Sequence, residues 1–232
     1  TLTQRLHNHL TARNVGDDLR RLGYYYEQIE MYPEAVNWYN QSYELDKSYK
    51  SLHNLARLSS YLNDLPTSLK QFADCLRCEI SDPLDLTTIT YNYCFTLSLT
   101  GDYKQANKVS ANLTELYDKV PKEKRNGQYW LDYGDHCLYN LLKTIEAVAK
   151  YESGLSSAGQ SSEHDIQILL GLVNACNKCV TLLPINDQHE MSNYKRKARS
   201  YFNRPQKLIK DAEILSNVNL GDLYFYNRDI EE

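Results

Sequence analysis

A sequence repeat with a period of about 33 residues, in which each unit contains two helical patterns, constrains the fold of this chain more than any other feature. Leu19, Leu22 and Tyr26 follow one another at spacings of three and four, which is typical of one face of a helix. Pro33 then marks the start of a second helix, where its missing N–H costs little. Leu19 recurs as Leu52, one period later. Such a period predicts a solenoid of stacked helix pairs.

Two segments resemble the tetratricopeptide repeat. The first combines Gly23 with the run Tyr32-Pro33-Glu34-Ala35, and the second is the turn Gly101-Asp102-Tyr103-Lys104-Gln105-Ala106. A degenerate further unit starts at Trp130. The resemblance implies an all-α, right-handed solenoid of antiparallel helix pairs, with about three to four repeats plus C-terminal helices. It also implies a concave groove that binds peptides or protein surfaces.

The predicted organisation has four parts. Residues 1–15 form an N-terminal helix or the remnant of a preceding repeat, and residues 16–120 form three repeats of the tetratricopeptide type. Residues 128–183 form a degenerate helix pair with a flexible loop at 152–163, in which one helix from Trp130 continues through Val148. Residues 189–232 form a basic helix, broken at Pro205, and a C-terminal capping segment. Because the chain starts at Thr1 and not at Met, we expect it to be part of a longer protein.

The groove should be lined by residues on the first helix of each pair that lie off the packing stripe. The residues that we assign to partner binding are Arg20, Tyr24, Lys50, His53, Asn54, Arg57, Tyr91 and Asn92, and the same offsets add Glu27, Thr88 and Phe95. Asn and Arg can hydrogen-bond the backbone of a peptide, and Tyr adds rigid amphipathic area. Since the basic residues oppose an acidic chain, we expect an extended or helical partner segment of acidic character. The alternative is that these residues are solvated groove positions without a partner.

The family members that bind chaperone tails hold two carboxylates with a clamp of Lys, Arg and Asn side chains. Asn54 matches one asparagine of that clamp, and Arg20 stands where a Lys is expected. Tyr24, Thr88 and Asn92 replace the other Asn, Lys and Arg. The resemblance therefore does not favour a chaperone co-factor.

The formal net charge of -4 conceals a basic segment at residues 195–210, which contains no acidic residue. Its basic residues are Lys195, Arg196, Lys197, Arg199, Arg204, Lys207 and Lys210. With Tyr201 and Phe202 interleaved, this segment could contact RNA or another anionic partner. The alternative is a solvated helix face, or a face that pairs with acidic residues of the same chain.

No pattern of catalytic residues stands out. The pairs Cys75/Cys78 and Cys176/Cys179 have the spacing of zinc ligands, but they lie in helical stripes, which favours structural cysteines over a metal site. We therefore expect no catalytic residue, no metal and no cofactor. Six scattered cysteines favour a reducing compartment, cytoplasmic or nuclear. No apolar run is long enough to span a membrane.

The sequence thus predicts a non-catalytic scaffold that binds a peptide or helix of a protein partner within a larger complex. The alternative is a subunit of a ribonucleoprotein or enzyme complex in which residues 195–210 contact RNA.

Overall fold

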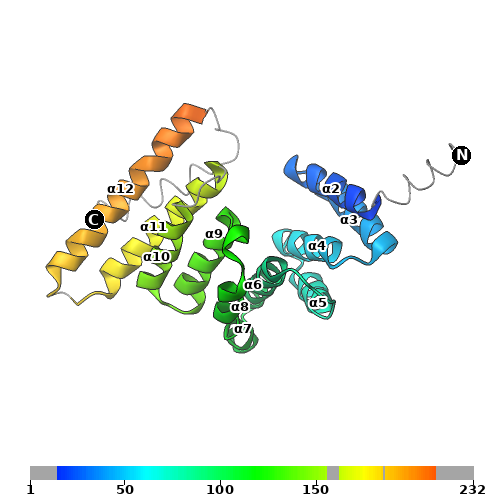
Figure 1. Ribbon diagram of the computed structural model, residues 1–232, viewed down its shortest axis with the longest axis horizontal. Helices are drawn as coiled ribbons and strands as arrows, with labels where there is room; N and C mark the ends of the chain where they lie inside the picture. Colours follow the sequence, from blue (N-terminus) through cyan, green and yellow to red (C-terminus); the bar gives the residue numbers. More distant parts are fainter. Residues whose placement is uncertain (1–14, 156–161, 185, 213–232) are drawn as a thin grey trace, which may run out of the picture. The chain divides into compact units, whose positions relative to one another are not determined.

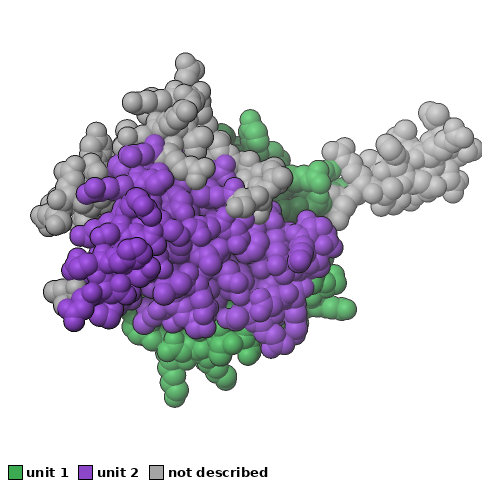
Figure 2. Space-filling view, turned by 60° about the vertical axis from the view of Figure 1, so that its left-hand side comes forward, with its two compact units in different colours: residues 1–113 green, residues 114–232 purple. Residues whose placement is uncertain are grey.

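The computed structural model describes residues 15–155, 162–184 and 186–212, and the chain divides into two compact units, residues 1–113 and 114–232 (Figures 1 and 2). The predicted N-terminal helix before Val15 and the predicted capping segment after Ala212 lie outside the described residues. The described residues are helices and connections, without a strand. This all-α content confirms the predicted fold class.

The described part of unit 1, residues 15–113, contains three successive helix pairs. Their helices are α2 (Val15–Gln28), α3 (Tyr32–Asp46), α4 (Tyr49–Tyr61), α5 (Leu65–Cys75), α6 (Pro83–Leu99) and α7 (Tyr103–Ser110). The members of each pair pack together, and the pairs stack through α3 on α4 and α5 on α6 (Figure 1). One period of the sequence therefore corresponds to one helix pair.

Side chains in the turns explain where these helices begin. Asp64 accepts a hydrogen bond from the backbone N–H of Thr67 at the start of α5, at 3.3 Å. Asp102 accepts one from Gln105 in the same way at the start of α7, at 3.1 Å. Such N-caps satisfy backbone donors that have no partner within the helix.

The two helices of the first pair approach closely at Gly23. A Cβ atom added to Gly23 would lie 2.6 Å from Cδ1 of Tyr39, whose side chain is fully buried on α3. In the second pair, buried Ala56 and Phe72 stand at the equivalent positions and share one core cluster. A small residue on the first helix thus faces an aromatic ring on the second.

Gly23→Leu should lower the free energy of unfolding by about 1–3 kcal/mol, because the larger side chain overpacks this contact with Tyr39. Urea unfolding followed by circular dichroism measures the change. The control is Gln28→Leu, at an exposed position of the same helix. Equal stability of the two variants would contradict the close approach at Gly23.

Hydrogen bonds between the helices of a pair recur at a sequence separation of 12. Tyr39 bonds to Glu27, and Ser59 bonds to Gln71. The same separation joins Ser68 to the carbonyl of Ala56 and Cys94 to that of Ala106. Each of the three helix pairs thus has a hydrogen bond at this separation.

Unit 2, residues 114–232, continues the helical pattern. Its elements are α8 (Leu113–Lys119), which begins at the boundary, a 3-10 turn (Lys122–Lys124), α9 (Gly127–Asp135), a π-helical turn (His136–Asn140), α10 (Thr144–Leu155), α11 (Ser162–Leu182) and α12 (Gln188–Ala212). Helix α10 packs on α9 and α11, and α12 packs on α11. Gly134 of α9 faces the ring of Tyr151 on α10, as Gly23 faces Tyr39 in unit 1.

The structure differs from the sequence-based expectations for this unit in three places. The helix expected from Trp130 through Val148 ends in the π-helical turn, and Leu142 adopts a left-handed conformation with φ of 55° before α10 begins. Helix α12 continues through Pro205, where a break was expected. Helix α10 also covers the first part of the predicted loop 152–163, up to Leu155.

Candidate partner-binding site

A surface pocket of about 350 Å³ lies in unit 1, over the C-terminal halves of α4 and α6. The residues that line this α4–α6 pocket are Arg57, Ser60, Tyr61, Phe72, Asn92, Phe95, Thr96 and Leu99. Its volume is at the small end of the range of ligand sites, which is about 300–1,000 Å³. The pocket is large enough for one or two side chains of a bound segment.

The pocket brings together Arg57 and Asn92, which were assigned to the predicted groove, and Phe95, which the repeat spacing also placed there. Sequence reasoning missed Tyr61 and Leu99, whose side chains are 70% and 52% exposed. Phe95 is 50% exposed, and its ring stacks on that of Tyr91 with the ring centroids 6.5 Å apart. The pocket therefore has an apolar rim that is accessible to a partner.

Arg57 is held by a carboxylate from the neighbouring pair. Its Nη1 and Nη2 lie 2.6 Å from Oε1 and Oε2 of Glu27, a bidentate ion pair between α4 and α2. Tyr39 donates its hydroxyl to the same carboxylate at 2.8 Å. Burial alone would lower the pKa of Arg57, but the pairing with Glu27 holds the pKa above its usual value. The guanidinium is thus charged and fixed in place.

His53 holds the amide of Asn92. Nδ2 of Asn92 lies 3.1 Å from Nε2 of His53, and the imidazole packs on the ring of Phe72. Burial, with a smaller contribution from Arg57, lowers the pKa of His53 to about 3, so that the imidazole is neutral at pH 7. Nε2 can then accept an N–H from Asn92, which leaves Oδ1 of Asn92 as an acceptor.

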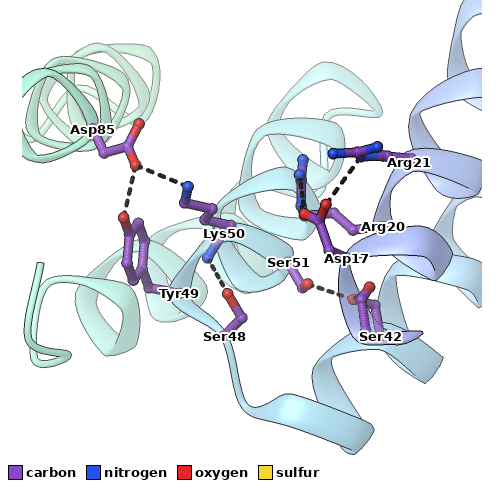
Figure 3. A network of polar contacts seen from close by, with 10 residues as sticks. Asp17, Arg20, Arg21, Ser42, Ser48, Tyr49, Lys50, Ser51 and Asp85 are labelled. Atoms are coloured by element: carbon purple, nitrogen blue, oxygen red, sulfur yellow. Dashed lines mark hydrogen bonds and ion pairs between the residues drawn. The ribbon is translucent and has the colours of Figure 1, made fainter. Parts of the chain in front are cut away.

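A polar network occupies the N-terminal halves of the same helices (Figure 3). Lys50 lies 3.6 Å from Asp85 of α6, and Tyr49 donates its hydroxyl to the same carboxylate at 2.7 Å. Arg20 and Arg21 both pair with Asp17 on α2. These basic residues therefore have acidic partners within the unit.

Two further predicted groove residues lie on the same helices. Tyr24 of α2 is exposed and close enough to Arg57 to act on its pKa. Asn54 of α4 is half-buried and does not line the pocket. Their roles in binding stay predictions.

The predicted basic segment lies on α12. Lys195, Arg196 and Arg199 are exposed, whereas Lys197 forms an ion pair with Glu152 of α10 at 3.0 Å. The side chains of Arg204, Lys207 and Lys210 lie outside the described residues. One basic residue of the segment thus pairs within the unit, and contact with RNA stays a prediction.

The candidate zinc pairs belong to different units, Cys75 and Cys78 to unit 1 and Cys176 and Cys179 to unit 2. Burial raises the pKa of the Cys75 and Cys176 thiols to about 12, so both are protonated at neutral pH. Protonated thiols are poor nucleophiles and poor metal ligands. In the described part of the chain, no group of three or more His, Cys, Asp and Glu residues could hold a metal ion.

Unit 2 contains a buried carboxyl that the sequence did not single out. Burial raises the pKa of Asp132 on α9 well above its usual range, although Gln128 donates a hydrogen bond to it at 2.6 Å. Asp135 adds to the rise in pKa. One turn along the chain, burial lowers the pKa of His136 to about 4. Both shifts favour the neutral side chains.

Comparison with solved structures identifies the fold. A thermophilic TPR protein from Thermus thermophilus superposes with a TM-score of 0.60 over 94% of this chain and 100% of that one, at 14% sequence identity. PilF of Pseudomonas aeruginosa superposes with a TM-score of 0.52 over 84% of this chain and 82% of that one, at 15% identity. The chain therefore has the fold of a tetratricopeptide-repeat solenoid.

Neither a protein-family model nor a curated protein sequence matches the chain. Among the helices of the described residues, none combines the length and apolar character that a membrane crossing requires.

Proposed function

We propose that this chain is a non-catalytic interaction scaffold and that the α4–α6 pocket of unit 1 binds a segment of a partner protein. The observation that carries the proposal is the position of the pocket: it lies among the predicted groove residues and is bordered by the exposed side chains of Tyr61, Phe95 and Leu99. Exposed apolar side chains around a concave site are typical of binding surfaces. The tetratricopeptide-type fold supports the same function.

The chemistry of the described residues supports a scaffold over nucleophilic catalysis. The thiols of Cys75 and Cys176 are protonated at neutral pH, and the imidazoles of His53 and His136 are buried and neutral. Catalysis by these thiols would need an accessible base beside them that accepts the proton. The polar groups of the pocket instead hold one another in place, which suits recognition.

A displayed library of random peptides, panned against the full chain, tests this function. We expect peptides that bind the chain to bind the double variant Phe95→Ala/Leu99→Ala at least about tenfold more weakly. Truncation of central apolar anchors commonly costs more than about 1 kcal/mol of binding free energy. Fluorescence anisotropy measures the affinities. The control is Leu45→Ala on α3, where the side chain is 58% exposed but does not line the pocket.

The melting temperature of each variant shows whether the fold is intact. Peptides that bind the double variant and the control equally well would place the site elsewhere. A library without any binding peptide would contradict the proposed function.

A further inference from the structure

The basic residues beside the pocket offer little to an acidic partner. Both terminal nitrogens of Arg57 already bind the carboxylate of Glu27. Lys50 and Arg20, further along the same helices, pair with Asp85 and Asp17 (Figure 3). An acidic segment would have to compete with these intramolecular carboxylates. The arrangement favours an uncharged anchor in the pocket.

The hydrogen bonds of two hydroxyl groups of the pocket, those of Ser60 and Thr96, have a defined donor and acceptor. Thr96 donates its hydroxyl hydrogen to the carbonyl of Asn92 at 2.8 Å. Since a threonine has a single hydroxyl hydrogen, the contact of 3.2 Å between Ser60 Oγ and Thr96 Oγ1 must use the hydrogen of Ser60. The lone pairs of Ser60 Oγ are then the remaining hydrogen-bonding capacity of that hydroxyl.

Asn92 supplies a second acceptor. Its Nδ2 lies 3.1 Å from Nε2 of the neutral imidazole of His53. In the tautomer with the hydrogen on Nδ1 of His53, Nε2 accepts from this amide, and Oδ1 of Asn92 is left as an acceptor. Asn92 and Ser60 both line the pocket, on α6 and α4. The other polar side chains of the lining, Arg57, Thr96 and Tyr61, have hydrogen-bond partners within the unit. The two acceptors therefore favour a ligand that carries a donor.

The walls favour an aromatic anchor. Phe72, Phe95, Tyr61 and Leu99 line the pocket, and the stacking of Phe95 on Tyr91 holds one wall in place. Trp and Tyr combine a large apolar ring with a single polar donor, and buried Trp N–H and Tyr O–H groups usually have a hydrogen-bond partner. Both side chains are also enriched among the residues that dominate binding energy at interfaces.

We infer that the α4–α6 pocket takes a Trp or Tyr side chain from an uncharged stretch of the partner, and that its N–H or O–H donates to Ser60 Oγ or Asn92 Oδ1. This inference rests on the proposed function and names the anchor that the pocket selects. It replaces the acidic segment that the sequence alone suggested.

The test uses capped amino acids as probes of the full chain. N-acetyl amides of Trp, Tyr, Phe and Glu are titrated to millimolar concentrations while the backbone amide resonances of the protein are followed by NMR. We expect saturable shifts within residues 57–61 and 92–99 for the Trp and Tyr amides. The Phe amide, which has the ring without the donor, should bind about 3- to 10-fold more weakly, the loss expected for one hydrogen bond. Added salt should leave the Trp affinity unchanged.

A double variant tests the acceptors. Ser60→Ala/Asn92→Leu should bring the Trp and Phe affinities within about twofold of each other, because both acceptors are gone. The matched control is Ser59→Ala/Asn40→Leu, since Ser59 bonds to Gln71, Asn40 is exposed on α3 and neither residue lines the pocket. The control should keep the preference for Trp. If the first double variant has a lowered melting temperature, Ser60→Ala alone should still reduce that preference.

Three results would overturn the inference: no saturable shift with the Trp or Tyr amide, tighter and salt-dependent binding of the Glu amide, or a Trp preference that survives both Ser60→Ala and the double variant. If peptides from the library still require Phe95 and Leu99, such a result rejects the aromatic anchor and leaves the proposed function intact. Loss of the library peptides as well would reject both.

Discussion

Glu27→Ala should lower the free energy of unfolding by about 2–4 kcal/mol. The variant removes the carboxylate that accepts hydrogen bonds from both terminal nitrogens of Arg57 and from the hydroxyl of Tyr39. Breaking a buried ion pair by removing one partner is costly, because the other charge stays in a poorly solvated position. We place the value below that of a fully buried pair because the side chain of Arg57 is partly exposed to water.

Urea unfolding of the full chain measures this change. The matched control is Glu44→Ala, which removes the exposed ion pair with Lys47 and should cost less than about 0.5 kcal/mol. Adding Arg57→Met to the first variant should recover part of the loss, because no uncompensated charge remains. A loss from Glu27→Ala no larger than that of the control would contradict the described pairing.

Asp132→Asn should raise the free energy of unfolding at neutral pH by about 1–3 kcal/mol. Burial raises the pKa of Asp132 in the folded chain, so folding is penalised once the unfolded chain can ionise this carboxyl. Asn has the same shape, keeps the acceptor for Gln128 and has no proton to lose. A polar residue is thus replaced by a neutral isostere with a gain in stability.

The sign of the pH dependence follows from the raised pKa. In the unfolded chain the Asp132 carboxyl has a pKa of about 3.9, and below that pH the carboxyl is protonated in both states, so its burial does not reduce the free energy of unfolding. As the pH rises from there toward the raised pKa of Asp132 in the folded chain, the unfolded chain ionises first and the free energy of unfolding falls. The advantage of Asp132→Asn should therefore be largest at about pH 7 and vanish near pH 3.5. Urea unfolding of both proteins across this range measures it, and the titration of His136 cancels in the difference. A constant or inverted difference would contradict the buried state of Asp132.

The first two helix pairs were predictable because their packing residues recur at one spacing. Ser42 and Cys75, one period apart, occupy matching buried positions: Ser42 donates to the carbonyl of Gly16, and Cys75 donates to that of Tyr49. Gly16 and Tyr49 are themselves separated by the same period. Repeated residues thus make repeated contacts, and periodicity alone is sufficient to find them.

Unit 2 was harder to predict because its apolar pattern runs across a turn without Gly or Pro. The chain reverses at Leu142, a residue that rarely adopts the left-handed conformation, and the preceding π-helical turn keeps the pattern helical up to that point. The spacing from Gly134 to Tyr151, which nearly equals that from Gly23 to Tyr39, was the signal that could have revealed the α9–α10 pair.

The site was predictable in position and not in chemistry. The repeat offsets placed Arg57 and Asn92 on the pocket, because stacked first helices align equivalent positions. They could not show that Glu27 neutralises Arg57 or that His53 orients Asn92, since these partners lie 30 and 39 residues away along the chain. Leu99, four residues after Phe95, was an apolar signal on the same face of α6.

The recurrence of hydrogen bonds between residues 12 apart in the helix pairs of unit 1 has a kinetic consequence. Tyr39 with Glu27, Ser68 with Ala56 and Cys94 with Ala106 each close a short loop. Short loops cost little chain entropy, and topologies built from local contacts fold quickly. A ribosome delivers each helix pair complete before the next one emerges. These bonds therefore allow the hairpin of α2 and α3 to form during synthesis and to serve as a template for the pairs that follow.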